Sequence, residues 1–399
     1  MRVLMISDVY FPRVNGVSTA IQTYRQQLQL VGIESTLIIP RYSNEPDEAD
    51  VTRLPSWRVP MDPEDRFVWP GRFKAAAREA AKNCDIIHIQ TPFSAHSAGI
   101  SIARATGLPV LASYHTLFEE YLHHYARGIP TNWLRGTARN ISRKQCNALD
   151  AVIVPSSPMA ERLSEYGVSK PMHILPTGIP LERFRSGDRE RFRKHYQIDE
   201  SRPVALFVGR AAHEKNIDFL IHTLQRALPE CPQLLLLIAG EGPALEHLRD
   251  EVHQRGLADS VRFVGYLDRA SELPDCYAAA DVFVFASRTE TQGLVLLEAM
   301  AAGLPVIALA EMGTRDILTA ESGAIAPPDH VETFAVELIR VINNPALRDE
   351  MRSKGKTWAA EWSDVALTAR LAALYRSLLD NKPATEKTRW KAPSKAKPA

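Results

Sequence analysis

The stretch that decides the fold runs from Asp281 to Ala310 and reads DVFVFASRTETQGLVLLEAMAAGLPVIALA. It contains an apolar, β-rich run at Val282–Ala286, an apolar helical run that opens at Gly293, and a second β-rich run at Val306–Ala308. Strands that are apolar throughout are covered on both faces, which is typical of parallel sheets with crossover helices. The stretch therefore predicts one strand–helix–strand unit of an α/β domain.

The same alternation of short apolar runs and helical stretches continues on both sides of this unit. Two prolines and a glycine punctuate the chain at Ile174–Pro180, which divides the pattern into two similar halves. We therefore expect two doubly wound, Rossmann-like domains at residues 1–180 and 181–365, then a helix over Ser363–Asp380 and a disordered basic tail over 381–399. The other expected strands are Val3–Ser7, Ser35–Ile39, Ile86–Gln90, Val110–Ser113, Ala151–Pro155, Val204–Val208, Leu234–Ala239 and Val261–Val264.

Composition places the chain among ordinary globular proteins. With 399 residues, 45% of them hydrophobic and 24% charged, it is long enough to bury more than one core. The longest apolar run, Leu294–Ala310, is broken by Glu298 and Pro305 and does not reach the roughly 20 residues of a membrane-spanning helix. The first residues lack the apolar core of a signal peptide, and the four cysteines lie far apart. We therefore expect a reduced, cytoplasmic protein without a transmembrane anchor.

Charge is unevenly distributed along the chain although the net charge is only +1. Residues 1–180 carry +3, residues 181–380 carry −7 and residues 381–399 carry +5. Basic regions on both sides of an acidic domain indicate an anionic partner such as a membrane surface. Charge that is scattered over a solvated surface gives the same counts, so composition alone leaves both interpretations open.

Two acidic residues, Glu290 and Glu298, flank the start of the helix in the opening stretch. If Gly293 opens that helix, the N–H groups of Leu294 and Val295 face the carboxyl end of the sheet, which is an anion site suited to a diphosphate. One carboxylate can then reach a sugar beyond the phosphates and the other a ribose behind them, since carboxylates accept two hydroxyl hydrogen bonds. A helix with acidic residues near its start is the alternative, but Glu298 interrupts an apolar helix and needs a partner there.

Two cations follow the strand Val204–Val208. Arg210 comes directly after Gly209, and Lys215 lies five residues further on. A guanidinium can bind two phosphate oxygens at once, and an ammonium adds a compact charge. Surface pairing with Glu214 is the alternative interpretation.

Candidate residues also follow other expected strands. Gly240 and Glu241 come after a buried strand, where a glycine lets the backbone approach a flat ligand. Gly16 lies in the turn after the first strand, and His115 follows Val110–Ser113 at the sheet edge where ligands of open α/β sheets bind. The sequence contains neither a paired-histidine metal motif nor an Asp-x-Asp motif, so we expect no metal and no other cofactor.

Together these residues resemble those of the family 4 retaining glycosyltransferases, which have the GT-B fold. The resemblance covers nearly the whole chain, and its most specific part is the Glu-x7-Glu spacing from Glu290 to Glu298. It implies an N-terminal acceptor-binding domain and a C-terminal nucleotide-sugar-binding domain that face each other across a cleft, with a final helix (366–380) that crosses back to the first domain. It also implies metal-independent transfer of a hexose from a nucleotide sugar with retention of configuration.

The resemblance assigns roles to individual residues. Arg210 and Lys215 resemble the diphosphate clamp, Glu290 the residue that orients the donor hexose, and Glu298 the residue that holds the ribose. His115 resembles a histidine near the transferred sugar, so the candidate catalytic residues are His115, Glu290, Arg210 and Lys215. The candidate donor-binding residues are Gly16 (the loop glycine that closes over the donor), Gly209, Gly240, Glu241, Gly293, Leu294, Val295 and Glu298.

Two departures from the commonest pattern of that family concern the acceptor. Asn15 stands where a second glycine is frequent, and Gln292 stands where an aromatic residue is frequent. Both resemble the branch that contains diacylglycerol glucosyltransferases and mannosyl- and sulfoquinovosyl-lipid synthases, as does the run His115–Tyr125. We therefore favour a diacylglycerol-type lipid acceptor and a peripheral location on the inner face of the cytoplasmic membrane.

A basic helix offers a route to such a membrane. The stretch Thr131–Leu149 contains four cations and no acidic residue, and cations of this kind suit an anionic leaflet. A solvated helix face is the competing interpretation. The candidate membrane or acceptor residues are Arg135, Arg139, Arg143 and Lys144.

Other functions compete with glycolipid synthesis. One is a GDP-mannose- or UDP-glucose-dependent transferase that acts on a soluble or polysaccharide acceptor, and another is a nucleotide-sugar-binding pseudoenzyme. A dinucleotide oxidoreductase is disfavoured because the first strand is not followed by Gly-x-Gly-x-x-Gly. A nucleic-acid partner is not expected, because no binding motif accompanies the basic residues. The donor nucleotide and the hexose stay open.

Overall fold

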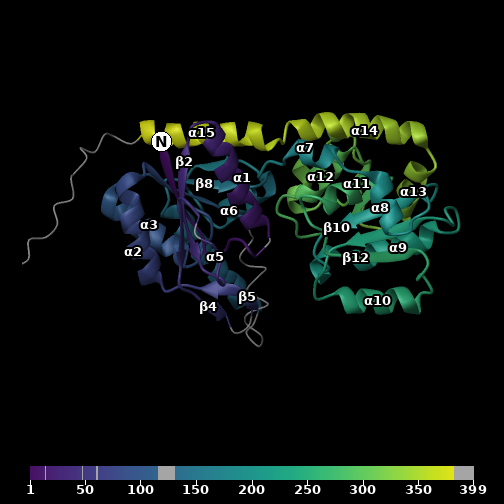
Figure 1. Ribbon diagram of the computed structural model, residues 1–399, viewed down its shortest axis with the longest axis horizontal. Helices are drawn as coiled ribbons and strands as arrows, with labels where there is room; N and C mark the ends of the chain where they lie inside the picture. Colours follow the sequence, from purple (N-terminus) through teal and green to yellow (C-terminus); the bar gives the residue numbers. More distant parts are fainter. Residues whose placement is uncertain (14, 47, 60–61, 116–130, 382–399) are drawn as a thin grey trace, which may run out of the picture.

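The computed structural model describes residues 1–13, 15–46, 48–59, 62–115 and 131–381. In these ranges the chain forms two α/β halves that lie side by side (Figure 1). Each half is built around a parallel sheet whose strands are connected through helices. The predicted fold class, with two Rossmann-like halves, is therefore confirmed.

The N-terminal half contains seven parallel strands in the order β3-β2-β1-β6-β7-β8-β9. Side chains alternate across this sheet: Leu4 and Ile6 of β1 pack with α2, α3, α5 and α6, whereas Val3 and Met5 pack with α1 and α15. The strands are β1 (Arg2–Ile6), β2 (Glu34–Pro40), β3 (Val51–Leu54), β6 (Ile86–Ile89), β7 (Val110–Ser113), β8 (Ala151–Val154) and β9 (Met172–Ile174). The helices are α1 (Gly16–Leu30), α2 (Pro70–Ala80), α3 (Ser94–Thr106), α5 (Thr131–Asn147), α6 (Ser157–Glu165) and α15 (Asp364–Asp380).

The C-terminal half contains five parallel strands in the order β12-β11-β10-β13-β14. One continuous apolar core joins both faces of this sheet to the surrounding helices. The strands are β10 (Val204–Val208), β11 (Leu235–Ala239), β12 (Val261–Gly265), β13 (Val282–Phe285) and β14 (Val306–Ala308). The helices are α7 (Leu181–Arg185), α8 (Arg189–His195), α9 (Ile217–Ala227), α10 (Leu245–Gln254), α11 (Glu272–Ala279), α12 (Leu294–Ala302), α13 (Val331–Ile342) and α14 (Pro345–Ala360).

The strands that the sequence predicts all occur, with ends that differ by one residue at most. The structure adds β3 and β9, which lie at the two edges of the N-terminal sheet, and the antiparallel pair β4 (Trp57–Val59) and β5 (Asp62–Phe67). These strands were missed because edge strands and hairpins are not buried on both faces. β9 has no fully buried residue, and only Leu54 is buried in β3, so neither shows the continuous apolar run of an inner strand.

The last helix lies on the N-terminal half (Figure 1). After α14 the chain meets the linker between the halves, where the Ile179 N–H donates to Trp362 O at 3.0 Å and the Asp364 N–H donates to Ile179 O at 3.1 Å. α15 then packs against α1 and contributes Leu371 and Tyr375 to the core under the first sheet. Among the helices of the described residues, none combines the length and the hydropathy that crossing a membrane requires.

Candidate functional site

The start of α12 lies at the carboxyl edge of the C-terminal sheet, directly after the loop that follows β13. Gly293 precedes the helix with a φ of 89°, a left-handed conformation that favours glycine, and the Leu296 N–H donates to Gly293 O at 3.0 Å. The N–H groups of Leu294 and Val295 come before that first intrahelical bond. The positive end of the helix dipole and these two donors can therefore bind an anion.

Lys215 and Glu290 form an ion pair beside this helix start. The Lys215 Nζ lies 2.6 Å from Glu290 Oε2, and both side chains are half-buried. The short 3-10 helix His213–Lys215 after β10 presents the lysine, and the loop after β13 presents the glutamate. Pairing with Glu214, the alternative interpretation for Lys215, is therefore wrong: the partner is a residue from a different loop.

Backbone bonds hold the three loops of this edge together. The Ala211 N–H donates to Glu241 O at 2.9 Å, and the Gly240 N–H donates to Gly265 O at 2.8 Å. A Cβ at Gly240 would lie 1.9 Å from Gly209 O, so the glycine is required by the neighbouring loop itself. Arg210 and Glu241 project exposed side chains from these loops, and within the described ranges Arg210 forms no ion pair.

Glu298 is buried in α12 and has two partners that sequence reasoning missed. Its side chain is 2% exposed; Oε1 is paired with the Arg269 guanidinium, and Oε2 accepts a hydrogen bond of 2.9 Å from the Tyr277 hydroxyl. The carboxylate raises the pKa of Arg269, and burial raises the pKa of Tyr277 well above its usual value. The expectation that this carboxylate needs a partner is therefore correct. Arg269 lies shortly after the end of β12, and this position at the carboxyl edge of the sheet was the sequence signal that could have identified it as a site residue.

His115 lies across the junction, at the end of β7 in the N-terminal half. Its Nε2 is 3.1 Å from Gln90 Oε1, and burial lowers the pKa of His115 to about 4, so the imidazole is neutral at pH 7. The amide nitrogen of Gln90 is buried and bonds to no other described residue. Behind it, His88 contacts the Tyr375 hydroxyl at 2.6 Å and Ser113 Oγ at 2.8 Å, which connects this edge to α15.

The two halves meet directly between these groups. The Thr291 hydroxyl donates to His115 O at 3.2 Å, and the Ser156 hydroxyl donates to Thr291 O at 2.8 Å. Glu290 and His115 are therefore joined through one intervening residue, Thr291. The structure thus brings His115 close to the loop that carries Glu290 and leads into α12.

Gly16 and the basic residues of α5 lie on two helices of the N-terminal half, α1 and α5. Gly16 is exposed at the start of α1, where Asn15 caps the helix by accepting from the Ser18 N–H at 2.8 Å. α5 is a helix as predicted, and Arg139, Arg143 and Lys144 are exposed on it. The Arg139 guanidinium lies over the Tyr166 ring at 5.4 Å, and Arg143 donates to Asn140 Oδ1 at 3.0 Å. The side chain of Arg135, like the run His115–Tyr125 beyond His115 itself, lies outside what the structure describes.

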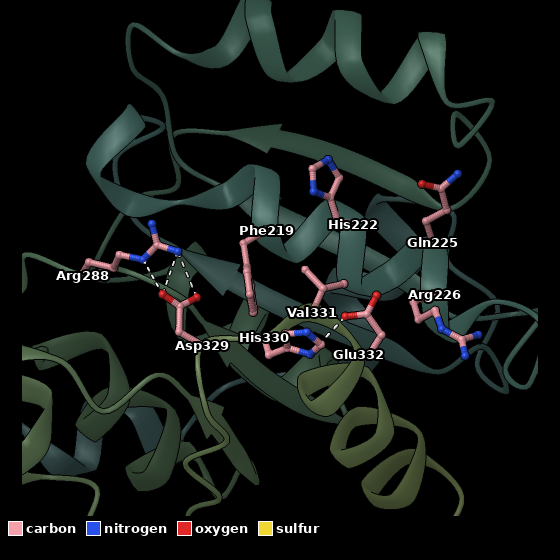
Figure 2. A pocket seen from close by; sticks show the side chains of 9 residues that line it. All are labelled: Phe219, His222, Gln225, Arg226, Arg288, Asp329, His330, Val331 and Glu332. Carbon is pink, nitrogen blue, oxygen red and sulfur yellow. Dashed lines mark hydrogen bonds and ion pairs between the residues drawn. The ribbon is translucent and has the colours of Figure 1, made fainter.

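Two features of the C-terminal half include none of these residues. A group of potential metal ligands, Asp218, His247 and Glu251, occurs on α9 and α10, where His247 Nε2 is 3.0 Å from Asp218 Oδ1. An open groove of about 570 Å³ lies between α9 and the start of α13, and an ion pair between Arg288 and Asp329 closes one end (Figure 2). Neither feature was predicted, and neither includes a candidate donor-binding residue.

Family models match both halves of the chain. The model "Glycosyltransferase Family 4" matches residues 14–183, and the model "Glycosyl transferases group 1" matches residues 188–358. The chain is 34% identical over 321 residues to an alpha-monoglucosyldiacylglycerol synthase of Streptococcus pneumoniae. The aligned region covers 77% of this chain and 71% of that protein. It is 28% identical over 372 residues to a GDP-mannose-dependent alpha-mannosyltransferase of Mycobacterium tuberculosis, covering 90% and 93% of the two chains.

Solved structures share the fold along almost the whole chain. A sucrose-phosphate synthase from Thermosynechococcus elongatus superposes with a TM-score of 0.78 at 22% identity and covers 96% of this chain and 100% of that one. Anabaena Alr3699/HepE, solved in complex with UDP-glucose, superposes with a TM-score of 0.73 at 16% identity and covers 94% and 100%.

Proposed function

Because this chain belongs to the family 4 glycosyltransferases of GT-B fold, and is therefore a hexosyltransferase, we propose that it transfers a hexose from a UDP- or GDP-linked donor to a diacylglycerol-type membrane lipid. The observation that carries the donor half of this proposal is the Lys215–Glu290 pair at the open start of α12. The start of α12 therefore has a cation, a carboxylate and two backbone N–H donors beside one another, and these are the groups that bind a sugar attached to a diphosphate. The UDP-glucose complex of Alr3699/HepE supports the same donor class.

Each donor group has a proposed contact. The diphosphate binds the N–H groups of Leu294 and Val295 and the cations of Lys215 and Arg210, which stabilise the charge that develops on the leaving phosphate. These groups supply positive charge without a metal, and we propose that no metal or other cofactor takes part.

Both glutamates remain available to hydroxyl groups. Lys215 contacts one oxygen of Glu290, which leaves the other for the hexose. Each oxygen of Glu298 already accepts one bond, but a carboxylate oxygen can accept a second, so the ribose can bind without displacing Arg269 or Tyr277.

His115 acts as a neutral hydrogen-bonding group in this proposal. With a pKa of about 4 it carries no charge at neutral pH; its Nε2–H donates to Gln90 Oε1, which leaves Nδ1 as an acceptor for a hydroxyl of the transferred sugar. We propose transfer with retention, in which the acceptor hydroxyl attacks from the side of the leaving group and the leaving phosphate takes its proton.

Each half of the molecule has a separate proposed role in substrate binding. We propose that the first domain (1–180), with the crossing helix 366–380, binds the acceptor, and that the second domain (181–365) binds the donor. The separate sheets support this division, as does the packing of α15 on α1. Of the basic tail predicted at 381–399, residues 382–399 lie outside the described residues.

The lipid acceptor is supported by the name of the pneumococcal relative, an alpha-monoglucosyldiacylglycerol synthase, and by the exposed cations of α5. We propose that α5 docks the enzyme on the inner face of the cytoplasmic membrane. The second candidate is a GDP-mannose- or UDP-glucose-dependent transferase that acts on a soluble or polysaccharide acceptor, and the name of the mycobacterial relative supports the GDP-mannose donor. A binding protein without activity is disfavoured, because the candidate catalytic residues His115, Glu290, Arg210 and Lys215 are all present.

The test is incubation of the purified chain with labelled UDP- and GDP-hexoses and vesicles that contain diacylglycerol. We expect label in the organic phase with one of the two nucleotides, and none with a Glu290→Ala variant. Label transferred only to a soluble or polymeric acceptor would favour the second candidate. No transfer and no donor hydrolysis with any donor would contradict the proposal.

A further inference from the structure

Gln292 lies between the two glutamates of the donor motif, but its side chain points to the other half of the molecule. Its amide nitrogen donates to Thr177 O at 2.7 Å, and its amide oxygen accepts from the Thr177 N–H at 2.9 Å. Gln292 is 6% exposed and Thr177 5% exposed, so both bonds are shielded from water. Thr177 belongs to the linker after β9, 115 residues away along the chain.

The neighbouring residue adds two further bonds across the same junction. Thr291 donates to His115 O at the end of β7 and accepts from Ser156 at the end of β8. The pair Thr291–Gln292 therefore contacts three segments of the N-terminal half. It also sits immediately between Glu290 and Gly293, which begins the anion-binding end of α12.

We propose that Gln292 is a positioning residue that sets the placement of α12 and Glu290 relative to His115, an inference that rests on the proposed function. Both polar atoms of its amide bond to the backbone of Thr177 and the side chain is 6% exposed, so the amide faces the N-terminal half. Two opposed bonds to the backbone of one residue define both distance and direction, whereas an apolar contact defines only proximity. A carboxamide suits this place because it both donates and accepts, which a hydrocarbon aromatic ring such as that of phenylalanine does not.

Other contacts keep the halves folded and associated when this amide is removed. The Ser157 N–H donates to Asp316 Oδ2 at 2.6 Å, and the linker bonds of Ile179 do not involve the motif. A Gln292→Ala variant is therefore expected to fold and to misplace the two halves slightly. Because a misplacement of about 1 Å can cost on the order of 100-fold in rate, we expect kcat to fall roughly 10- to 100-fold.

The same variant should leave donor binding nearly unchanged. The proposed contacts with the diphosphate and the ribose belong to the C-terminal half, so the dissociation constant for UDP or GDP, measured by calorimetry, should stay within about twofold. The matched control is Asn147→Ala. Asn147 donates to Gly167 O and accepts from the Ser169 N–H in the same two-way pattern, but within the N-terminal half alone. Asn147 also accepts from the Ser169 hydroxyl, so this control should lose one hydrogen bond more than Gln292→Ala without the loss of kcat.

A Gln292→Glu variant provides a signature that a purely structural role would not produce. The ionised carboxylate cannot donate to Thr177 O, whereas the protonated acid can donate to this oxygen and still accept from the Thr177 N–H. The ratio of its kcat to that of the wild type should therefore rise as pH falls from 8 to 5, with the nucleotide dissociation constant unchanged. An equal ratio at all pH values would contradict the hydrogen-bond account.

A distance measurement separates this inference from the proposed function. Spin labels attached through Lys82→Cys and Glu246→Cys place one probe on the exposed surface of each half. We expect one narrow distance distribution in the parent chain and in Asn147→Ala, and a broader one in Gln292→Ala. If no donor supports activity, the proposed function fails while this measurement still tests the positioning role. Unchanged distances and kcat in Gln292→Ala, or weaker nucleotide binding with unchanged kcat, would overturn it.

Discussion

Replacement of Arg269 by methionine tests how the buried carboxylate of Glu298 is held. Methionine keeps much of the length of the side chain but leaves Glu298, which is 2% exposed, with the Tyr277 hydroxyl as its remaining described partner. Removal of one partner from a fully buried ion pair costs about 3–5 kcal/mol, and the 31% exposure of the Arg269 side chain reduces this value through solvent screening. We expect a loss of about 2–4 kcal/mol in the free energy of unfolding, or roughly 5–15 °C in Tm.

The pH dependence of this loss has a defined sign. Without Arg269, the ionised carboxylate of Glu298 is buried with no cation beside it, which disfavours the charged form in the folded chain. The folded variant then binds a proton more readily than the unfolded chain, so its stability increases as pH falls. The difference from the wild type should therefore be smaller at pH 5 than at pH 7.5.

Urea unfolding at these two pH values measures both effects, with Arg288→Met as the matched control. Arg288 forms an ion pair with Asp329 that is largely exposed, so the same substitution there should cost about 1 kcal/mol or less. In the Arg269→Met background, Glu298→Gln should recover stability because it removes the unpaired charge. If Arg269→Met costs no more than Arg288→Met, or costs the same at both pH values, the account of Glu298 is wrong.

Four other predictions concern the proposed site. Glu298→Ala and Arg210→Ala should each weaken donor-nucleotide binding in calorimetry, since each removes a hydrogen-bonding or charged partner, and unchanged affinity in both would refute the donor-site assignment. Transfer activity should survive EDTA; full loss that Mg²⁺ or Mn²⁺ restores would contradict the metal-free mechanism. The His115 imidazole should show no NMR titration between pH 6 and 8 and should become charged near pH 4. Because the folded pKa of His115 lies below its unfolded value of about 6.5, the unfolded chain binds the proton first, and the chain should become less stable as pH falls from about 6.5 to 4. On a chain that ends at Asp380, sedimentation with anionic vesicles should weaken as salt rises, and it should weaken in a variant with glutamine at Arg135, Arg139, Arg143 and Lys144. Donor hydrolysis should persist in that variant. Equal binding to neutral and anionic vesicles would count against electrostatic docking of α5.

The inner strands and the position of the open start of α12 could be predicted from the sequence because their signals are local. A strand that is covered on both faces, such as β10 or β13, is a short apolar run, and every residue of both is buried. The glycine at 293 and the acids at 290 and 298 have a spacing that one helix converts directly into geometry. The edge strands β3 and β9 lack that local signal, because only one of their faces meets a core.

The partners of the site residues were decided by tertiary structure. Lys215 meets Glu290 across 75 residues, Arg269 meets Glu298 across 29, and Gln292 meets Thr177 across 115. Periodicity and spacing describe which face of an element is apolar, but they do not say which loops of different elements converge at one edge of a sheet. That convergence depends on strand order, with β13 next to β10 and β12 at the far edge, and on how the second half docks against the first. The sequence alone could therefore identify Lys215, Glu290 and Glu298 as charged groups of the site, whereas only the packed fold decided that each of these three is paired.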